Sequence, residues 1–161
     1  NLHKIQKILQ NMSSKEKVIP LIISNKYHEF EEQGLIGGGT SLALKFDPES
    51  IKKIISLQGK IVKKINKFRK KNIHPRYENN TLSKPFIQNL KKYGYPFIGK
   101  LFTPHISLGS FNNMEMIKKI KELCSPQIFS GPSKLTNLSL YKLHIGDKPE
   151  LIRDFELQQL L

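Results

Sequence analysis

The sequence contains very little cysteine. Cys124 is the only one among 161 residues, which excludes an intramolecular disulfide and a zinc site built from cysteines. No histidine is paired with a second ligand at the spacing of a metal motif. We therefore predict a protein of a reducing compartment, the cytoplasm, that works without a metal ion or other cofactor. The histidines that we interpret as surface or structural residues are His28, His74 and His144.

Long hydrophobic segments are also missing. The longest apolar run, residues 18–23, contains Pro20 and is far too short to span a membrane. We predict no transmembrane helix and no membrane partner. The length and the hydrophobic content of 38% instead predict one folded domain over residues 1–161, which we expect to be a monomer.

Acidic residues are scarce beside basic ones. The chain has 13 Asp and Glu against 27 Lys and Arg, a formal charge of +14. Such an imbalance attracts polyanions and favours RNA, DNA or nucleotides as partners. Lysines that merely coat a helix and keep it soluble would give the same composition, so both interpretations remain open.

Apolar spacing predicts the first elements of the chain. Residues 2–12 have helical spacing, and residues 18–23 are typical of a strand in which Pro20 marks an edge or a bulge. Residues 27–33 are polar and give no clear prediction. The glycines at 37–39 precede a strand rather than a helix, so we interpret them as a hairpin or bulge and not as a phosphate loop.

A strand and a long helix follow the glycines. Leu42, Leu44 and Phe46 alternate with smaller or polar residues, as in a strand. Asp47 and Pro48 then supply an N-cap and a first-turn proline for the helix. Its predicted core stripe is Ile51, Ile54, Ile55, Ile61, Ile65 and Phe68, and its outer face carries Lys52, Lys53, Lys60, Lys63, Lys64, Lys67 and Lys71.

A long polar connection covers residues 72–95. Connections of this length inside compact domains often carry function. Tyr93 and Tyr95 at its end are placed to stack on a nucleotide base, although core packing explains such aromatics equally well. Lys100 lies just beyond them. The connection leads into a short strand that we expect to end before Gly109.

The strand after this connection brings two polar groups together. Pro104 fixes its entry, and His105 and Ser107 share one face while Ile106 and Leu108 point into the core. An imidazole beside a hydroxyl can move a proton and bind an anion. An ordinary strand with a half-exposed histidine is the alternative interpretation.

The chain closes with a helix and two strands. Asn112, with Glu115 three residues on, resembles a capping box for a helix through Leu123. Residues 134–143 and 151–157 are predicted as the two strands. The order of the elements predicts an α+β fold, with antiparallel sheet and helices on one side.

The segment Thr103-Pro104-His105-Ile106-Ser107-Leu108, with the basic helix before it and the capped helix after it, gives the chain a family resemblance. The chain resembles the two-histidine phosphoesterases, in particular the 2′-5′ RNA ligase-like, RNA 2′,3′-cyclic phosphodiesterase branch. The resemblance implies two pseudo-symmetric lobes of antiparallel sheet, with helices outside and a groove between them. Each lobe gives one His-x-Thr/Ser strand, and His105 and Ser107 fall on the second motif.

The first motif is missing from this sequence. In the family it lies just before a helix, and the chain opens on such a helix at residues 2–12. His3 lies within that helix and is followed by Lys4 and Ile5, so it is not the first motif. We expect the first lobe to be incomplete here and the natural chain to continue upstream. A degenerate protein with a single histidine is the alternative.

The resemblance implies a metal-independent phosphodiesterase, a hydrolase of RNA 3′ ends or of small cyclic or 2′-5′-linked nucleotides. Two histidines would divide the general acid and base roles, one of them being His105. Ser107 would stabilise charge on a non-bridging phosphate oxygen. We expect substrate contacts from Lys100, Tyr93 and Tyr95. The alternative is a binding module of the same fold that holds RNA without cleaving it.

Overall fold

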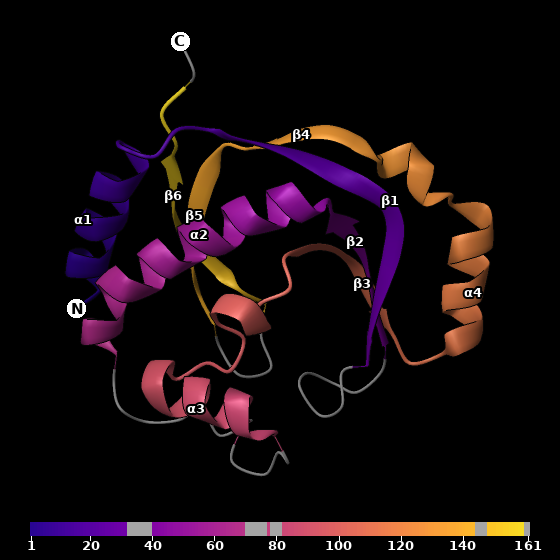
Figure 1. Ribbon diagram of the computed structural model, residues 1–161, viewed down its shortest axis with the longest axis horizontal. Coiled ribbons are helices and arrows are strands. Elements are labelled where there is room, and N and C mark those ends of the chain that lie inside the picture. Colours follow the sequence, from indigo (N-terminus) through magenta and orange to yellow (C-terminus); the bar gives the residue numbers. More distant parts are fainter. Residues whose placement is uncertain (32–39, 70–76, 78–81, 144–147, 160–161) are drawn as a thin grey trace. The chain divides into compact units, whose positions relative to one another are not determined.

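The structure is a computed structural model that combines helices with antiparallel sheets, so the predicted α+β class is confirmed (Figure 1). It describes residues 1–31, 40–69, 77, 82–143 and 148–159. The chain divides into two compact units, Asn1–Pro20 with Lys134–Leu161 and Leu21–Ser133. The single domain, the pseudo-symmetric lobes and the groove stay predictions.

The first unit consists of one helix and one hairpin, which are α1 (Leu2–Ser13), β5 (Asn137–Lys142) and β6 (Glu150–Glu156). The strands pair antiparallel, and α1 contacts both. The helix predicted at residues 2–12 is therefore confirmed. Leu9 and Met12 are buried on α1, as is Phe155 on β6. Burying each such side chain stabilises the fold by roughly 1.5–3 kcal/mol.

The strand predicted at residues 134–143 is in fact two strands. β4 (Gly131–Leu135) belongs to a four-stranded sheet, whereas β5 pairs with β6. Between them, the Thr136 carbonyl accepts a hydrogen bond of 2.7 Å from the backbone N–H of Leu157. The chain changes its partner strand at Thr136, and a change of partner leaves no mark in the hydrophobic pattern.

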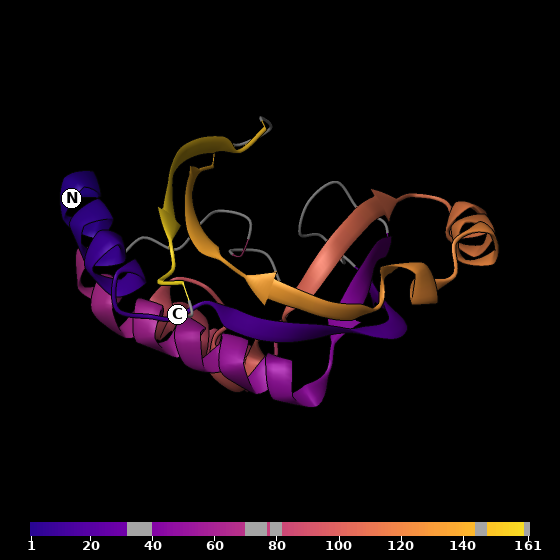
Figure 2. The same ribbon diagram turned by 90° about the horizontal axis from the view of Figure 1, so that it is seen from above.

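The four-stranded sheet has the order β3-β2-β1-β4, and β1 (Ile19–Glu31) pairs antiparallel with β2 (Thr40–Phe46). β1 bends along its length, and its register with β2 shifts between Ile23 and Tyr27 (Figure 2). Residues 27–33 carry no clear prediction from their sequence. Residues 27–31 belong to β1. The glycines at 37–39 lie outside the described residues.

Polar residues of β1 find partners on the helix α4 (Met114–Leu123) and just after it. The Tyr27 hydroxyl donates a hydrogen bond to the carbonyl of Cys124, and Lys121 forms an ion pair with Glu29. These contacts explain why a polar segment is part of a strand. The N-cap of α4 is Asn113 rather than the predicted Asn112, because the Asn113 side chain accepts from the backbone N–H of Glu115 at 2.8 Å.

The long helix α2 (Pro48–Ile65) begins as predicted. The Asp47 side chain accepts hydrogen bonds from the backbone N–H groups of Ser50 at 3.0 Å and Glu49 at 3.2 Å. Leu57, which the predicted core stripe omitted, is the buried apolar residue of α2, and the isoleucines of the stripe are half-buried. Phe68 belongs to a separate short helix, η1 (Asn66–Phe68).

The polar connection at 72–95 contains a helix, α3 (Lys84–Tyr93), that the sequence analysis missed. Gly94 ends it with φ of 74°, a left-handed conformation that favours glycine. The next segment is held by two side-chain amides. Asn89 donates to the carbonyls of Pro96 at 2.9 Å and Ile98 at 3.0 Å. Gln58 of α2 donates to the carbonyl of Phe97 at 3.2 Å.

Candidate functional site

The strand that carries the predicted pair is β3 (His105–Phe111), at one end of the sheet order. As predicted, the strand begins directly after Pro104. Pro104 itself is buried. The strand does not end before Gly109, however, but runs on to Phe111. A Cβ atom at Gly109 would lie 2.9 Å from the tip of the Phe111 ring, so a larger residue there would displace that ring.

The prediction that Ile106 and Leu108 point into a core is wrong. Their exposed fractions are 37% and 39%, whereas Leu42 and Leu44 on the neighbouring β2 are 0% and 3% exposed. The reason is position in the sheet. β3 has a sheet neighbour on one side only, while β2 lies between β1 and β3 and is covered on both of its faces.

The register of three strands brings a second histidine to the face of His105. Ala43 of β2 is paired with His28 of β1 and with Ser107 of β3, so these three form one row across the sheet. Lys45 is paired with His105 in an adjacent row. Directly paired residues, and residues two apart on a strand, share a face. His28, Lys45, His105 and Ser107 therefore share one face.

His105 is oriented by the backbone that leads into its strand. Its Nδ1 lies 2.8 Å from the carbonyl oxygen of Thr103. A carbonyl can only accept a hydrogen bond, so Nδ1 carries the hydrogen. In the neutral ring Nε2 is then the basic nitrogen, which accepts or, once protonated, returns a proton. The strand exposes the imidazole to solvent, as general acid and base catalysis requires.

The electrostatic environment of His28 reflects the same arrangement. Burial, and then the nearby Lys45 and His105, lower the pKa of His28 below its ordinary value of 6.5. Each of the two neighbours is or can become a cation, so protonating His28 adds like charge to the face. An anion bound there would relieve that repulsion.

Ser107 and Lys45 complete the face. Within the described residues, the exposed Ser107 hydroxyl makes no hydrogen bond and Lys45 makes no ion pair. The acidic residue next to His28, Glu29, points to the opposite face, where Lys121 pairs with it. The face thus combines groups that donate hydrogen bonds to an anion, and the nearest carboxylate of β1 is directed away from it.

The other predicted site residues lie in and after α3. Tyr95 packs edge-on against Tyr77, with ring centroids 6.2 Å apart, and against Phe97 at 5.5 Å. The ammonium of Lys92 lies 5.0 Å from the ring centroid of Tyr93. Lys100 is exposed in the short helix η3 (Gly99–Leu101). The aromatic contacts favour packing for Tyr95, and the substrate contacts of these residues stay predictions.

Sequence reasoning missed His28 and Lys45 as members of this face. His28 was interpreted as a surface or structural residue, because it lies in a polar segment without an apolar alternation. The signal that would have found it is the pairing of β1 with β2, which no spacing within a single strand reveals. His74 and His144 lie outside the described residues.

Metal-binding clusters and membrane-spanning helices were both sought among the described residues. Among the described residues, no group of three or more His, Cys, Asp or Glu is arranged to hold a metal ion. None of the described helices combines the length and apolar character needed to cross a membrane.

Comparisons with known proteins were made at three levels. No protein-family model, curated protein or solved structure matches the chain. The resemblance to the two-histidine phosphoesterases thus depends on the residues of the Thr103 to Leu108 motif and on the order of the elements around it.

Proposed function

We propose that the protein is a metal-independent phosphodiesterase of the two-histidine class, acting on RNA 3′ ends or on small cyclic or 2′-5′-linked nucleotides. His105 exchanges a proton with an oxygen of the reacting phosphodiester through Nε2. Ser107 donates a hydrogen bond to a non-bridging oxygen as the phosphorus becomes five-coordinate. In the family that the chain resembles, the second histidine comes from another His-x-Thr/Ser motif, which this sequence does not contain.

The observation that supports the proposal most is the shared face of His28, Lys45, His105 and Ser107. Lys45 and His28 hold the substrate phosphate beside His105. Burial, and then Lys45 and His105, lower the pKa of His28 and disfavour its charged form, whereas a phosphate bound beside it favours that form. Phosphate binding and proton uptake are thereby linked.

The alternative function is an RNA-binding module without turnover. The observation that favours it is the basic surface of α2, where Lys60, Lys63 and Lys64 are exposed. A module that binds RNA through such lysines loses affinity steeply with salt. For single strands, the slope of log K against log salt is about −0.7 per phosphate neutralised, so four contacts give roughly −3.

The experiment that tests the function is a turnover assay on a short oligonucleotide ending in a 2′,3′-cyclic phosphate. We expect hydrolysis by the full-length protein, with unchanged rates in excess EDTA. We also expect a higher kcat/KM than for the matching nucleoside 2′,3′-cyclic phosphate, because the basic surface extends over a helix. Salt-sensitive binding with no turnover of either substrate would reject the enzyme in favour of the binding module.

A further inference from the structure

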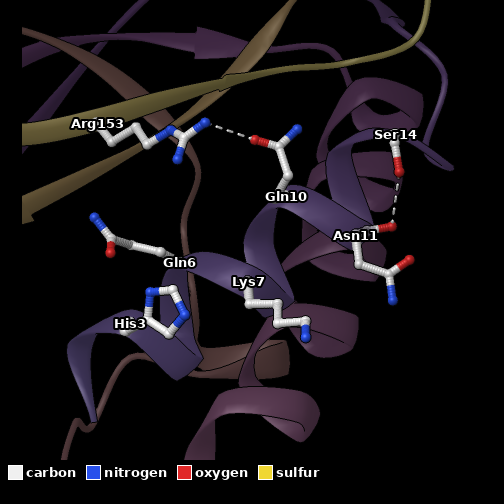
Figure 3. Close-up of a pocket in the computed structure, with 7 residues that line it drawn as sticks. All are labelled: His3, Gln6, Lys7, Gln10, Asn11, Ser14 and Arg153. Carbon is white, nitrogen blue, oxygen red and sulfur yellow. Dashed lines mark hydrogen bonds between the residues drawn. The ribbon is translucent and has the colours of Figure 1, made fainter.

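A cavity of about 340 Å³ lies in the first unit, between α1 and β6 (Figure 3). Its volume is at the lower end of the range for small-molecule sites, which is about 300–1,000 Å³. Five of its lining residues come from one side of α1, the sixth is the C-cap residue of that helix, and the seventh comes from β6. They are His3, Gln6, Lys7, Gln10, Asn11, Ser14 and Arg153.

The residues of the lining are all polar or basic and none is acidic, although most of the surface that they turn to the cavity is apolar. Lys7 and Arg153 carry permanent positive charge, and His3 can acquire one. Within the described part of the chain, neither Lys7 nor Arg153 forms an ion pair. The first turn of α1 has no acidic side chain that would offset these charges. The cavity therefore favours an anionic ligand.

Arg153 is held in place before any ligand arrives. Its guanidinium donates a hydrogen bond of 3.0 Å to the Oε1 atom of Gln10, the contact drawn in Figure 3. The same group lies 5.3 Å from the ring centroid of Phe155, which is 1% exposed. A guanidinium positioned in this way retains further N–H donors for a phosphate. Less side-chain entropy is lost on binding, because the side chain is already ordered.

The remaining lining groups are side-chain amides. Gln6, Gln10 and Asn11 each offer an acceptor oxygen and two amide hydrogens, and such groups pair with the edges of nucleic-acid bases. The Gln10 oxygen already accepts from Arg153, so its amide hydrogens remain to donate. The Ser14 hydroxyl donates a hydrogen bond to the backbone carbonyl of Asn11. The side chain of Asn11 takes no part in that bond.

From this lining we infer that the α1–β6 cavity binds one nucleotide, with Arg153 and Lys7 on the phosphate and the side-chain amides on the base. This site shares no residue with the face of His105 and does not depend on the proposed phosphodiesterase activity. The nucleotide is either free in solution or one unit of an RNA strand, because both present the same phosphate and base.

The direct test is an NMR titration of the ¹⁵N-labelled full-length protein with 5′-AMP. We expect amide shift changes that concentrate on α1 and β6. Lys7→Gln and Arg153→Gln should each weaken the fitted affinity about tenfold, since each removes a charged partner of the phosphate. Lys4→Gln is the matched control, because Lys4 lies on the same helix but does not line the cavity. It should leave the affinity unchanged.

The remaining outcomes are also decisive. Tighter binding of an oligonucleotide without a terminal cyclic phosphate than of AMP would identify the RNA strand as the source. Equal binding of AMP and inorganic phosphate would overturn the base contacts, and equal losses in Lys4→Gln and Lys7→Gln would overturn the site. Lys7 is exposed and forms no ion pair among the described residues. The Lys7 variant therefore tests the site even where Arg153→Gln lowers the melting temperature. A protein that binds AMP in this way but hydrolyses no cyclic phosphate would retain this inference and lose the proposed function.

Discussion

The β1–β2–β3 face and the α1–β6 cavity both gather basic side chains, yet they do so with different groups. The face contains two histidines beside one lysine, placed by strand register. The cavity contains one histidine, His3, beside Lys7, Arg153 and three side-chain amides. In the two proposals above, the face exchanges protons with a bound phosphate, whereas the cavity mainly holds one. Substitutions that separate turnover from nucleotide binding test this difference.

The largest expected effect is that of His105→Ala in the full-length protein. Removing a positioned acid or base lowers kcat by about 10²–10⁴. The melting temperature should stay within a degree or two, because His105 is exposed on an edge strand. AMP binding in the cavity should not change. Gln88→Ala, at an exposed position of α3, is the control for turnover, and an equal kcat loss in both variants would contradict the role of His105.

A smaller loss is expected for Ser107→Ala. A single hydrogen-bond donor to a developing oxyanion contributes about 10²–10³ in kcat. KM should change little, since the bond strengthens in the transition state. The exposed Ser56 of α2 provides the matched control, Ser56→Ala. A Ser107 variant that turns over substrate as fast as the wild type would show that the strand presents the hydroxyl without using it.

Asn89→Ala tests the support of the face rather than its chemistry. The change removes the donor for the carbonyls of Pro96 and Ile98, on the segment that leads into β3. We expect the free energy of unfolding to fall by roughly 1–3 kcal/mol, measured by urea denaturation. Gln88→Ala, on an exposed neighbouring position, should change it far less. Equal losses would mean that the two bonds do not stabilise the segment.

The smallest effect is expected for His28→Gln, and it should depend on pH. In the wild type, KM should fall as the pH drops through and below about 6.5, because the substrate phosphate favours the protonated form of an imidazole whose pKa is lowered in the empty face. The variant should lose this fall, with KM about tenfold higher at low pH and kcat nearly unchanged. Asn25→Ala, at an exposed position of the same strand, is the control. A KM profile identical to that of the wild type would remove His28 from the phosphate contacts.

Much of the local structure was predictable because its signals are local. The Asp47 cap, the amphipathic helix at the N-terminus and the α+β order all depend on residues close together in the chain. The errors fall where distant residues decide the outcome. The exposure of Ile106 follows from the edge position of β3, and the break at Thr136 follows from a change of partner strand. Helix α3 was missed although Phe86, Leu90 and Tyr93 repeat at helical spacing, because the polar residues between them make the whole segment resemble a loop.

The site was predictable only in part for the same reason. His105 and Ser107 are two residues apart on one strand, so alternation alone assigns them to one face. His28 and Lys45 reach that face through pairings across the sheet, over sequence separations that no motif spans. The α1–β6 cavity likewise needs Arg153 beside Gln10, two residues from opposite ends of the chain.

The pairing of β2 with β3 contains one irregularity with a consequence for how the face is specified. Leu42 is paired with Gly109 and Ala43 with Ser107, so Leu108 is an extra residue on β3. The two halves of the strand are consequently out of phase with each other. Beyond the extra residue, Ser110 shares a hydrogen bond of 2.6 Å with Ser41 and fixes the phase of the far half. Between Leu108 and His105 the side chains alternate between the two faces in the usual way. The number of residues between Ser110 and His105 therefore decides which face the imidazole occupies.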